Sequence, residues 1–249
     1  MLSRAYVRFR EGLPDGPNAA AAADGFSRIG AEVVPFDGFG DVATLPGLGA
    51  GACVVGYVCD VNSAMDALGL PRPELSDYPQ ELRPFLGRHV WSHLVLGDVR
   101  SCPRKHVFVK PHAQKLFTGL VWDGSRSARL RLAAYPDETP VHVSDVVEFV
   151  SEYRAFVLGR ELLDVRRYRG DWSVAPDRRV VEAAVAECPE RPAAFALDWG
   201  ITSDGRTLLV ERNDATALGH YGLASVPYAR MIEARWAELV QATGSAVLR

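Results

Sequence analysis

The stretch AAFALDWGITSDGRTLLVERND at 193–214 limits the fold more than any other part of this chain. Two apolar, strand-like runs flank the dipeptide Asp-Gly, which is typical of tight turns, so the segment predicts a β-hairpin. Residues two apart on a strand face the same side, so Glu211 and Asn213 project together. The partner strand is then expected to bring Asp198 opposite Glu211 or one of its neighbours.

This hairpin would gather two carboxylates and one amide oxygen on a single face. Oxygen ligands of this kind suit Mg²⁺, which usually takes one or two carboxylates and completes its shell with phosphates and water. The hairpin therefore predicts a magnesium site formed by Asp198, Glu211 and Asn213. For the segment taken alone, an acidic hairpin exposed to water is the alternative.

The composition excludes several classes of function. Hydrophobic residues make up 48% of the 249 residues and charged residues 24%, which is ordinary for a globular protein of one to three lobes. The net charge of −3 gives no reason to expect a nucleic-acid or membrane partner. No apolar run approaches the roughly 20 residues of a membrane span, so a cytoplasmic protein is expected. The cysteines are expected to be free thiols: Cys53, Cys59, Cys102 and Cys188.

The first part of the chain alternates strand and helix patterns. This alternation predicts a small α/β lobe over about residues 1–75. The predicted strands cover 5–9, 32–38 and 51–58, and the predicted helices cover 17–30 and 61–70. The glycines of GLGAG at 47–51 precede a strand, whereas a dinucleotide-binding fingerprint follows one, so a plain loop is predicted there.

The later part of the chain has a different pattern. Residues 75–99 predict a connector with one or two short helices, and the following short β-rich pieces predict a small antiparallel sheet. A second hairpin is expected to turn at Leu158-Gly159-Arg160. The β-rich pieces lie at 106–110, 116–124, 128–135 and 140–150, and the later helices are expected at 177–190 and 226–242.

Two lysines border a loop that follows an apolar strand. The sequence FVKPHAQKLFTGLVW at 108–122 carries Lys110 at the strand end and Lys115 in the polar loop 112–119. A lysine at a strand end beside a loop is a point charge suited to a phosphate. Two ordinary surface lysines are the alternative.

The segment VVEFVSEYRAFVLG at 146–159 reads as a connection between lobes. The backbone of such a connection can offer N–H and C=O groups to a flat purine edge. A carboxylate just beyond it, here Glu152, can accept hydrogen bonds from ribose hydroxyls.

Taken in order, these three elements resemble the ATP-grasp family. The matching pieces are FVKP, VEFVSEYRAFVLG and LDWGITSDGRTLLVERND, and the resemblance covers about residues 75 to 230. It implies an α/β (α+β) fold with an N-terminal pre-ATP-grasp lobe at 1–75. A small β-rich lobe at 76–150 and a lobe with the metal hairpin at 151–249 would follow.

The resemblance also implies roles for individual residues. Lys110 would hold the α- and β-phosphates of ATP, and Lys115 would neutralise the transferred phosphate under loop 112–119. Arg154 would reach a phosphate or the acceptor carboxylate, and Arg88 is the candidate for a further basic residue before the VKP strand. The remaining roles are adenine contact by Glu148, Phe149 and Val150, ribose contact by Glu152, and one or two Mg²⁺ ions on Asp198, Glu211 and Asn213.

The implied activity is ATP-dependent joining of a carboxylate to an amine, in the style of ligases that act on peptide or protein carboxylates. The carboxylate would be activated as an acylphosphate, with release of ADP and phosphate. Small-molecule or peptide substrates are expected, and a peptide or a second copy in a homodimer would complete the acceptor site. The alternatives are an ATP-grasp phosphotransferase acting on a hydroxyl and a nucleotide-binding regulator without turnover.

Three other signals remain open. His220 and Tyr221 follow the metal hairpin and are candidates for orienting a substrate, with a loop histidine and a packing tyrosine as the alternative. The basic run Arg166, Arg167 and Arg169 would meet an anionic substrate or face water. His89 and His93 would share one face of a helix, but no third zinc ligand is evident.

Overall fold

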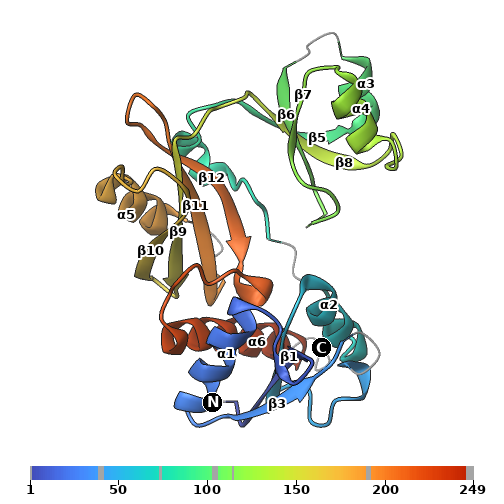
Figure 1. Cartoon of the computed structure of the whole chain (residues 1–249), viewed down its shortest axis with the longest axis vertical. Helices are drawn as coiled ribbons and strands as arrows, with labels where there is room; N and C mark the ends of the chain where they lie inside the picture. Colours follow the sequence, from blue (N-terminus) through green and yellow to red (C-terminus); the bar gives the residue numbers. More distant parts are fainter. Residues whose placement is uncertain are drawn as a thin grey trace. The chain divides into compact units, whose positions relative to one another are not determined.

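The computed structural model describes residues 2–38, 42–72, 75–102, 106–113, 115–188 and 192–244 (Figure 1). The chain forms two compact units. The first comprises Met1–Phe85 together with Val150–Arg249, and the second comprises Leu86–Phe149. The three-lobe division expected from the sequence stays a prediction. Within the described residues, no helix has the length and apolarity needed to cross a bilayer.

The first unit begins with the α/β arrangement predicted for its N-terminal part. Strand β1 pairs in parallel with β3 on one side and β4 on the other, and the short β2 pairs antiparallel with β1. The segment 47–51 is a turn that precedes β4, as predicted. The elements are β1 (Arg4–Arg10), β2 (Leu13–Pro14), α1 (Pro17–Arg28), β3 (Glu32–Phe36), η1 (Val42–Thr44), β4 (Ala52–Val55) and α2 (Val58–Ala67).

Helix α6 (Ser225–Gly244), near the end of the chain, packs against α1 (Figure 1). The two helices approach closely at Gly25, where an added Cβ would overlap the backbone carbonyl of Ser225 and lie 2.8 Å from Cβ of Ala229. One apolar core contains Phe26 of α1, Trp236 of α6 and the central strand β1. Segments from both ends of the chain therefore fold together.

The second sheet of this unit has the strand order β10-β9-β11-β12 and is antiparallel throughout. Both hairpins predicted from the sequence are confirmed, with the turns at the predicted positions. The elements are η2 (Gln80–Phe85), β9 (Ser151–Leu158), β10 (Glu161–Gly170), α5 (Arg178–Glu187), β11 (Ala194–Ile201), β12 (Thr207–Asp214) and η3 (Ala215–Ala217). The last two residues of the helix predicted at 177–190 lie outside the described residues.

One face of this sheet changes character along its length. Phe156, Ala194 and Ala196 join the core shared with α1 and α6. Two residues further along their strands, Arg154 and Asp198 occupy the same face, because they are direct neighbours in the register. Apolar packing thus anchors one end of the face, and the other end carries polar side chains.

The second unit, Leu86–Phe149, contains an antiparallel sheet of order β5-β8-β6-β7. Its apolar face packs on two short helices, with Val109, Leu120 and Leu132 in the core. This confirms the predicted small antiparallel sheet. The elements are β5 (Val90–Val95), α3 (Leu96–Ser101), β6 (Val107–Pro111), β7 (Leu120–Trp122), α4 (Arg126–Leu132) and β8 (Pro140–Ser144).

Two local predictions for this region are wrong. Residues 128–135 were expected to be β-rich but lie largely in α4, where Ser125 caps the helix by accepting a hydrogen bond from Ala128 N at 3.2 Å. Ala128 and Leu132 then share the buried helical face, a spacing that also fits a strand of alternating residues. The predicted connector 75–99 does contain η2, but it continues into β5, which pairs with β8.

The four cysteines lie among the described residues and are all free thiols, as predicted: Cys53, Cys59, Cys102 and Cys188. Burial raises the pKa of the Cys53 thiol, which lies in the core of the N-terminal sheet.

Candidate active site

The hairpin β11–β12 brings the three predicted metal ligands together. Asp198 lies opposite Glu211, and Asn213 lies opposite Ala196, so all three side chains share one face. The amide nitrogen of Asn213 is 3.1 Å from Asp198 Oδ2 and 3.2 Å from Glu211 Oε1. A register shift directly after Asp198 ends this pairing pattern. The hairpin thus presents its oxygen atoms as a compact group.

Arg154 of β9 completes this face. Its Nε and Nη2 donate to the two carboxylate oxygens of Asp198, each at 2.7 Å. The side chains are 8% and 4% exposed, so this bidentate pair is buried. Burial opposes the charge on Arg154, but the attraction of Asp198 and its hydrogen bonds outweigh that effect, and the pKa of Arg154 is raised. Asp198 is therefore held by a permanent cation.

Two tyrosines border the Arg154–Asp198 pair. The rings of Tyr168 and Tyr221 stack at 4.8 Å with an angle of 24° between their planes. The guanidinium carbon of Arg154 lies 4.9 Å from the centre of the Tyr221 ring and 6.0 Å from that of Tyr168. Burial, followed by the negative charges of Asp198 and Glu152, raises the pKa of Tyr168, so its phenol stays protonated.

The sequence did not single out Tyr168. It belongs to the basic stretch of β10, and the pairing of β10 with β9 contains two register shifts. A regular hairpin register would not place it correctly. The only signal available was its position on a strand next to the one that carries Glu152 and Arg154.

Glu152, the predicted ribose ligand, is held by two neighbours. Tyr168 Oη donates to Glu152 Oε2 at 2.9 Å, and Arg169 Nη1 donates to Oε1 at 2.6 Å. The rest of the basic run makes local contacts, with Arg166 paired to Asp164 and Arg167 donating to the carbonyl of Gly170. A carboxylate oxygen accepts more than one hydrogen bond, so Glu152 keeps the capacity to accept from a hydroxyl.

The loop after β12 is tied to its surroundings. The backbone N–H of His220 donates to Asn18 Oδ1 at 3.0 Å, and the hydroxyl of Tyr228 donates to the carbonyl of Leu218 at 2.5 Å. His220 Nδ1 accepts from the N–H of Gly222 at 3.1 Å. This histidine nitrogen is thus used within its own turn, and the loop histidine weighed as the alternative describes it better.

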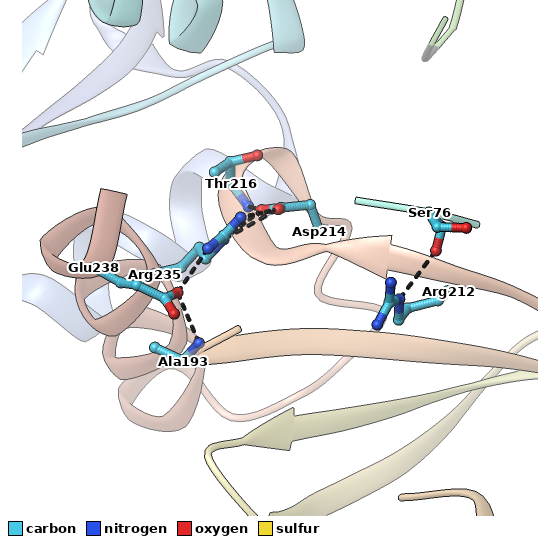
Figure 2. Close-up of polar contacts among 7 residues, drawn as sticks. All are labelled: Ser76, Ala193, Arg212, Asp214, Thr216, Arg235 and Glu238. Atoms are coloured by element: carbon cyan, nitrogen blue, oxygen red, sulfur yellow. Dashed lines mark hydrogen bonds and ion pairs between the residues drawn. The ribbon is translucent and has the colours of Figure 1, made fainter. Parts of the chain in front are cut away.

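Figure 2 shows how the end of β12 is fixed to α6. Arg235 of α6 donates to both carboxylate oxygens of Asp214, with the shortest contact at 2.6 Å from Nη2 to Oδ2. The same arginine donates to Glu238 Oε2 at 2.6 Å, and that oxygen also accepts from the N–H of Ala193 at 2.8 Å. Asp214 also accepts from the N–H of Thr216. These contacts anchor the residue next to Asn213.

The opposite face of β12 holds the segment that precedes η2. Arg212 is 2% exposed, and its Nε donates to the carbonyl of Ser76 at 3.0 Å (Figure 2). Its backbone N–H donates to the carbonyl of Asp77 at 2.9 Å, and Nη1 lies 3.6 Å from Cys188 Sγ. Alternation along the strand therefore gives Glu211 and Asn213 to the site and Arg212 to the packing behind it.

In the second unit, Lys110 lies in β6 directly opposite His142 of β8. The ring of His142 stacks on His112 at 4.2 Å, and its Nδ1 is 3.5 Å from Ser92 Oγ. Lys110, His112 and His142 share the face of the sheet that is opposite the apolar core. Lys110 is thus at a strand end, as predicted, and two histidines not singled out by the sequence accompany it.

Lys115 is exposed and has a φ of 57°, in the left-handed region that residues other than glycine seldom adopt. Its neighbour Gln114, in the predicted phosphate loop 112–119, lies outside the described residues. Arg88 is half-buried and donates to the carbonyl of Leu86 at 3.1 Å.

The predicted adenine-binding segment is extended. Glu148 is exposed and Phe149 half-buried, and both end the second unit, while Val150 begins the next part of the first. The N–H of Val150 already donates to the carbonyl of Ile201 at 2.8 Å, and its carbonyl accepts from Asp171 at 2.9 Å. An adenine contact at Val150 would therefore use its side chain or the remaining lone pair of the carbonyl.

The donor set on β11 and β12 fits a magnesium ion. Two carboxylates and a carboxamide supply hard oxygen atoms, and water or phosphate oxygens complete such a shell. Elsewhere the picture differs: His89 precedes β5 and His93 lies within it, so the helix that would place both on one face does not form. Over the described ranges, no cluster of three or more His, Cys, Asp and Glu side chains is arranged for a metal.

The two sheets, the strand-end lysine and the metal hairpin define an ATP-grasp domain. Residues 85–231, more than half of the chain, match an ATP-grasp domain family, the second family of its clade, and the chain belongs to that family. No curated protein sequence matches the chain.

Solved structures support the same fold along nearly the whole chain. The RimK domain protein ATP-grasp from Sphaerobacter thermophilus DSM 20745 aligns with a TM-score of 0.54 and 15% identity, covering 94% of this chain and 98% of its own. The macrocyclase MdnC bound with precursor peptide MdnA, from Microcystis aeruginosa MRC, gives 0.52 and 12%, covering 96% and 99%. The ATP-grasp ligase PsnB complexed with a phosphomimetic variant of minimal precursor, Mg and ADP gives 0.50 and 14%, covering 95% and 98%.

Proposed function

We propose that this protein is an ATP-dependent carboxylate–amine ligase. It activates a carboxylate as an acylphosphate and joins it to an amine, with release of ADP and phosphate. The observation that carries this proposal is the convergence of Asp198, Glu211 and Asn213 on one sheet face of an ATP-grasp chain. A protein that only bound a nucleotide would not need a complete set of metal ligands.

Asp198, Glu211 and Asn213 are the proposed ligands of one or two Mg²⁺ ions. Bound there, Mg²⁺ would supply neutralisation of the charge on the β- and γ-phosphates. Glu211 and Asn213 orient the phosphate chain by fixing the position of the cation. Arg154 provides a cation within the same face that persists at every pH at which the protein is folded.

The remaining roles are assigned to each unit separately. In the first unit, Glu152 accepts from the ribose, and Arg154 meets the transferred phosphate or the acceptor carboxylate. In the second, Lys110 and Lys115 neutralise phosphates, Arg88 adds a further cation, and Glu148 and Phe149, with Val150 of the first unit, contact adenine. Catalysis by such residues consists of positioning and charge neutralisation, because phosphoryl transfer needs little covalent chemistry from the protein.

We further propose a peptide or protein as the carboxylate substrate. Two of the structures with the same fold, those of MdnC and PsnB, are described as complexes with precursor peptides. A chain of this size leaves the acceptor side to be completed by the peptide itself or by a second copy in a homodimer. We place the enzyme in the cytoplasm, with neither nucleic acid nor membrane as a partner.

Calorimetry with ATP, in the presence and absence of Mg²⁺, tests the proposal. The wild type is expected to bind ATP with a clear dependence on Mg²⁺, and the variants Glu211→Ala and Asn213→Ala are expected to lose that dependence. In turnover, the loss of Glu211 should reduce kcat by about 10²–10³-fold, as for other groups that stabilise transition-state charge. Asp204→Ala, which removes an exposed acid from the turn of the same hairpin, is the matched control.

Each other outcome has a distinct meaning. A wild type that binds no ATP would refute the proposal. Release of ADP that needs a hydroxyl compound and no amine would support the phosphotransferase alternative, and tight binding without turnover on any peptide and amine would support the regulator. Light scattering of the active protein decides whether a second copy is required.

A further inference from the structure

Tyr221 has an unusual backbone. Its φ is 43°, in the left-handed region, which is disfavoured for a large aromatic residue. The surrounding turn keeps it there, since the N–H of Leu223 donates to the carbonyl of His220 at 2.7 Å and the N–H of His220 donates to Asn18. Such strain persists only where neighbouring contacts over-determine the conformation, and it is frequent at functional sites.

This backbone directs the ring of Tyr221 onto the polar face. One side of the ring stacks on Tyr168, whose hydroxyl is fixed by Glu152. The guanidinium of Arg154 lies within 4.9 Å of the ring centre, the range of a cation–π contact. The residue nevertheless stays 45% exposed, which is more than a tyrosine that serves only to fill the core.

The two contacts of Arg154 restrict it in different ways. The bidentate pair with Asp198 fixes one edge of the guanidinium, and the Tyr221 ring restricts its tilt. The third contact is weak, from Nη1 to the carbonyl of Gly219 at 3.4 Å. Each terminal nitrogen carries two hydrogens, so one on each remains for a further acceptor. The cation is therefore oriented and still has donors to offer.

We propose that Tyr221 is a positioning residue that holds Arg154 in the orientation in which it donates to the terminal phosphate of ATP. This inference rests on the proposed function, and it adds a residue that acts through Arg154 without touching the nucleotide. Tyr168 supports the arrangement from below, because it fixes the other side of the stack.

The N-terminal sheet offers a matched control. Tyr57 is 51% exposed, and the guanidinium carbon of Arg8 lies 4.8 Å from its ring centre. Arg8 is paired with the buried Asp60, as Arg154 is with Asp198. Tyr57 and Tyr221 thus resemble each other in exposure and in their contact with a paired arginine, but only Tyr221 borders the proposed site.

The test compares Mg·AMPPNP, which has a terminal phosphoryl group, with Mg·ADP, which has none. Both are titrated calorimetrically into the full-length wild type, Tyr221→Leu, Tyr221→Phe and Tyr57→Leu. Leucine removes the ring and leaves the backbone strain, whereas phenylalanine keeps the ring. We expect Tyr221→Leu to weaken Mg·AMPPNP by about tenfold, as for the loss of an oriented cation contact, and to leave Mg·ADP within about twofold. Tyr221→Phe and Tyr57→Leu should match the wild type.

Other outcomes overturn the inference in distinguishable ways. If Tyr221→Leu binds both nucleotides like the wild type, or loses both equally, Tyr221 does not position Arg154 and the proposed function stands. A wild type without preference for Mg·AMPPNP also refutes the role. If the wild type binds neither nucleotide, the proposed function fails. Should Tyr221→Leu melt well below Tyr57→Leu, Tyr221→Gly gives the answer, because glycine adopts a positive φ without strain.

Discussion

Arg154 and Asp198 face each other across neighbouring strands, and the two N–H···O contacts of 2.7 Å make them a buried bidentate pair. Removal of either partner leaves the other as an uncompensated buried charge. We expect Arg154→Met and Asp198→Leu each to lower the free energy of unfolding by about 3–5 kcal/mol. The double substitution should recover a large part of that loss, as measured by urea denaturation.

The exposed pair Asp204–Arg206, in the turn of the same hairpin, provides the control for this cycle. Asp204→Asn should not change the urea midpoint measurably, because exposed ion pairs contribute little. If the losses for Arg154→Met and Asp198→Leu simply added in the double variant, the two side chains would not be coupled and the pair would not hold this face together.

Gly25 tests the shared packing of the two ends of the chain. Replacement of a helical glycine by alanine usually stabilises a helix by about 0.5–1 kcal/mol. Here the new Cβ would overlap the carbonyl of Ser225 and crowd Ala229, so Gly25→Ala is expected to destabilise the protein by about 1–3 kcal/mol. Thermal unfolding measures the sign directly. Ser27→Ala, on the exposed side of α1, should be neutral or slightly stabilising, and a stabilising Gly25→Ala would contradict the close contact of α1 with α6.

The metal face was predictable from the sequence because its geometry is local. A short turn fixes the register of a hairpin, and the alternation of strand residues then places Glu211 and Asn213 on one side. Asp198 follows from the same register, without any knowledge of the rest of the fold.

The surroundings of that face were not predictable in the same way. The stack of Tyr168 on Tyr221 depends on two register shifts in β10 and on a strained turn, neither of which leaves a clear pattern in the sequence. The contact of α1 with α6 joins segments about 200 residues apart and depends on a single small residue, Gly25. The helix α4 was missed because a spacing of four apolar residues is shared by both periodicities.

Arg212 is expected to hold the segment before η2 against the back of β12. The substitution Arg212→Met removes the donor to Ser76 and leaves the backbone bond to Asp77 intact. Local opening of residues 75–80 should become easier, and cleavage there by a nonspecific protease should accelerate several-fold. Arg206→Met, on the exposed turn of the same hairpin, is the control. Equal cleavage rates in both variants would show that the guanidinium of Arg212 does not hold this segment.

Tyr168 predicts a change of stability at alkaline pH. Its pKa is raised by burial and by the charges of Asp198 and Glu152, so the folded protein keeps the phenolic proton at a pH where the unfolded chain loses it. The stabilisation is complete below the unfolded pKa of about 10 and decreases above it, by up to about 1.4 kcal/mol per pH unit. The free energy of unfolding of the wild type and of Tyr168→Phe, measured from pH 9 to 11, isolates this effect, because the other titrating groups are common to both. The wild type should lose stability relative to Tyr168→Phe above pH 10. A constant difference over this range would mean that Tyr168 titrates normally, and that the negative charges of the site do not act on it as the structure indicates.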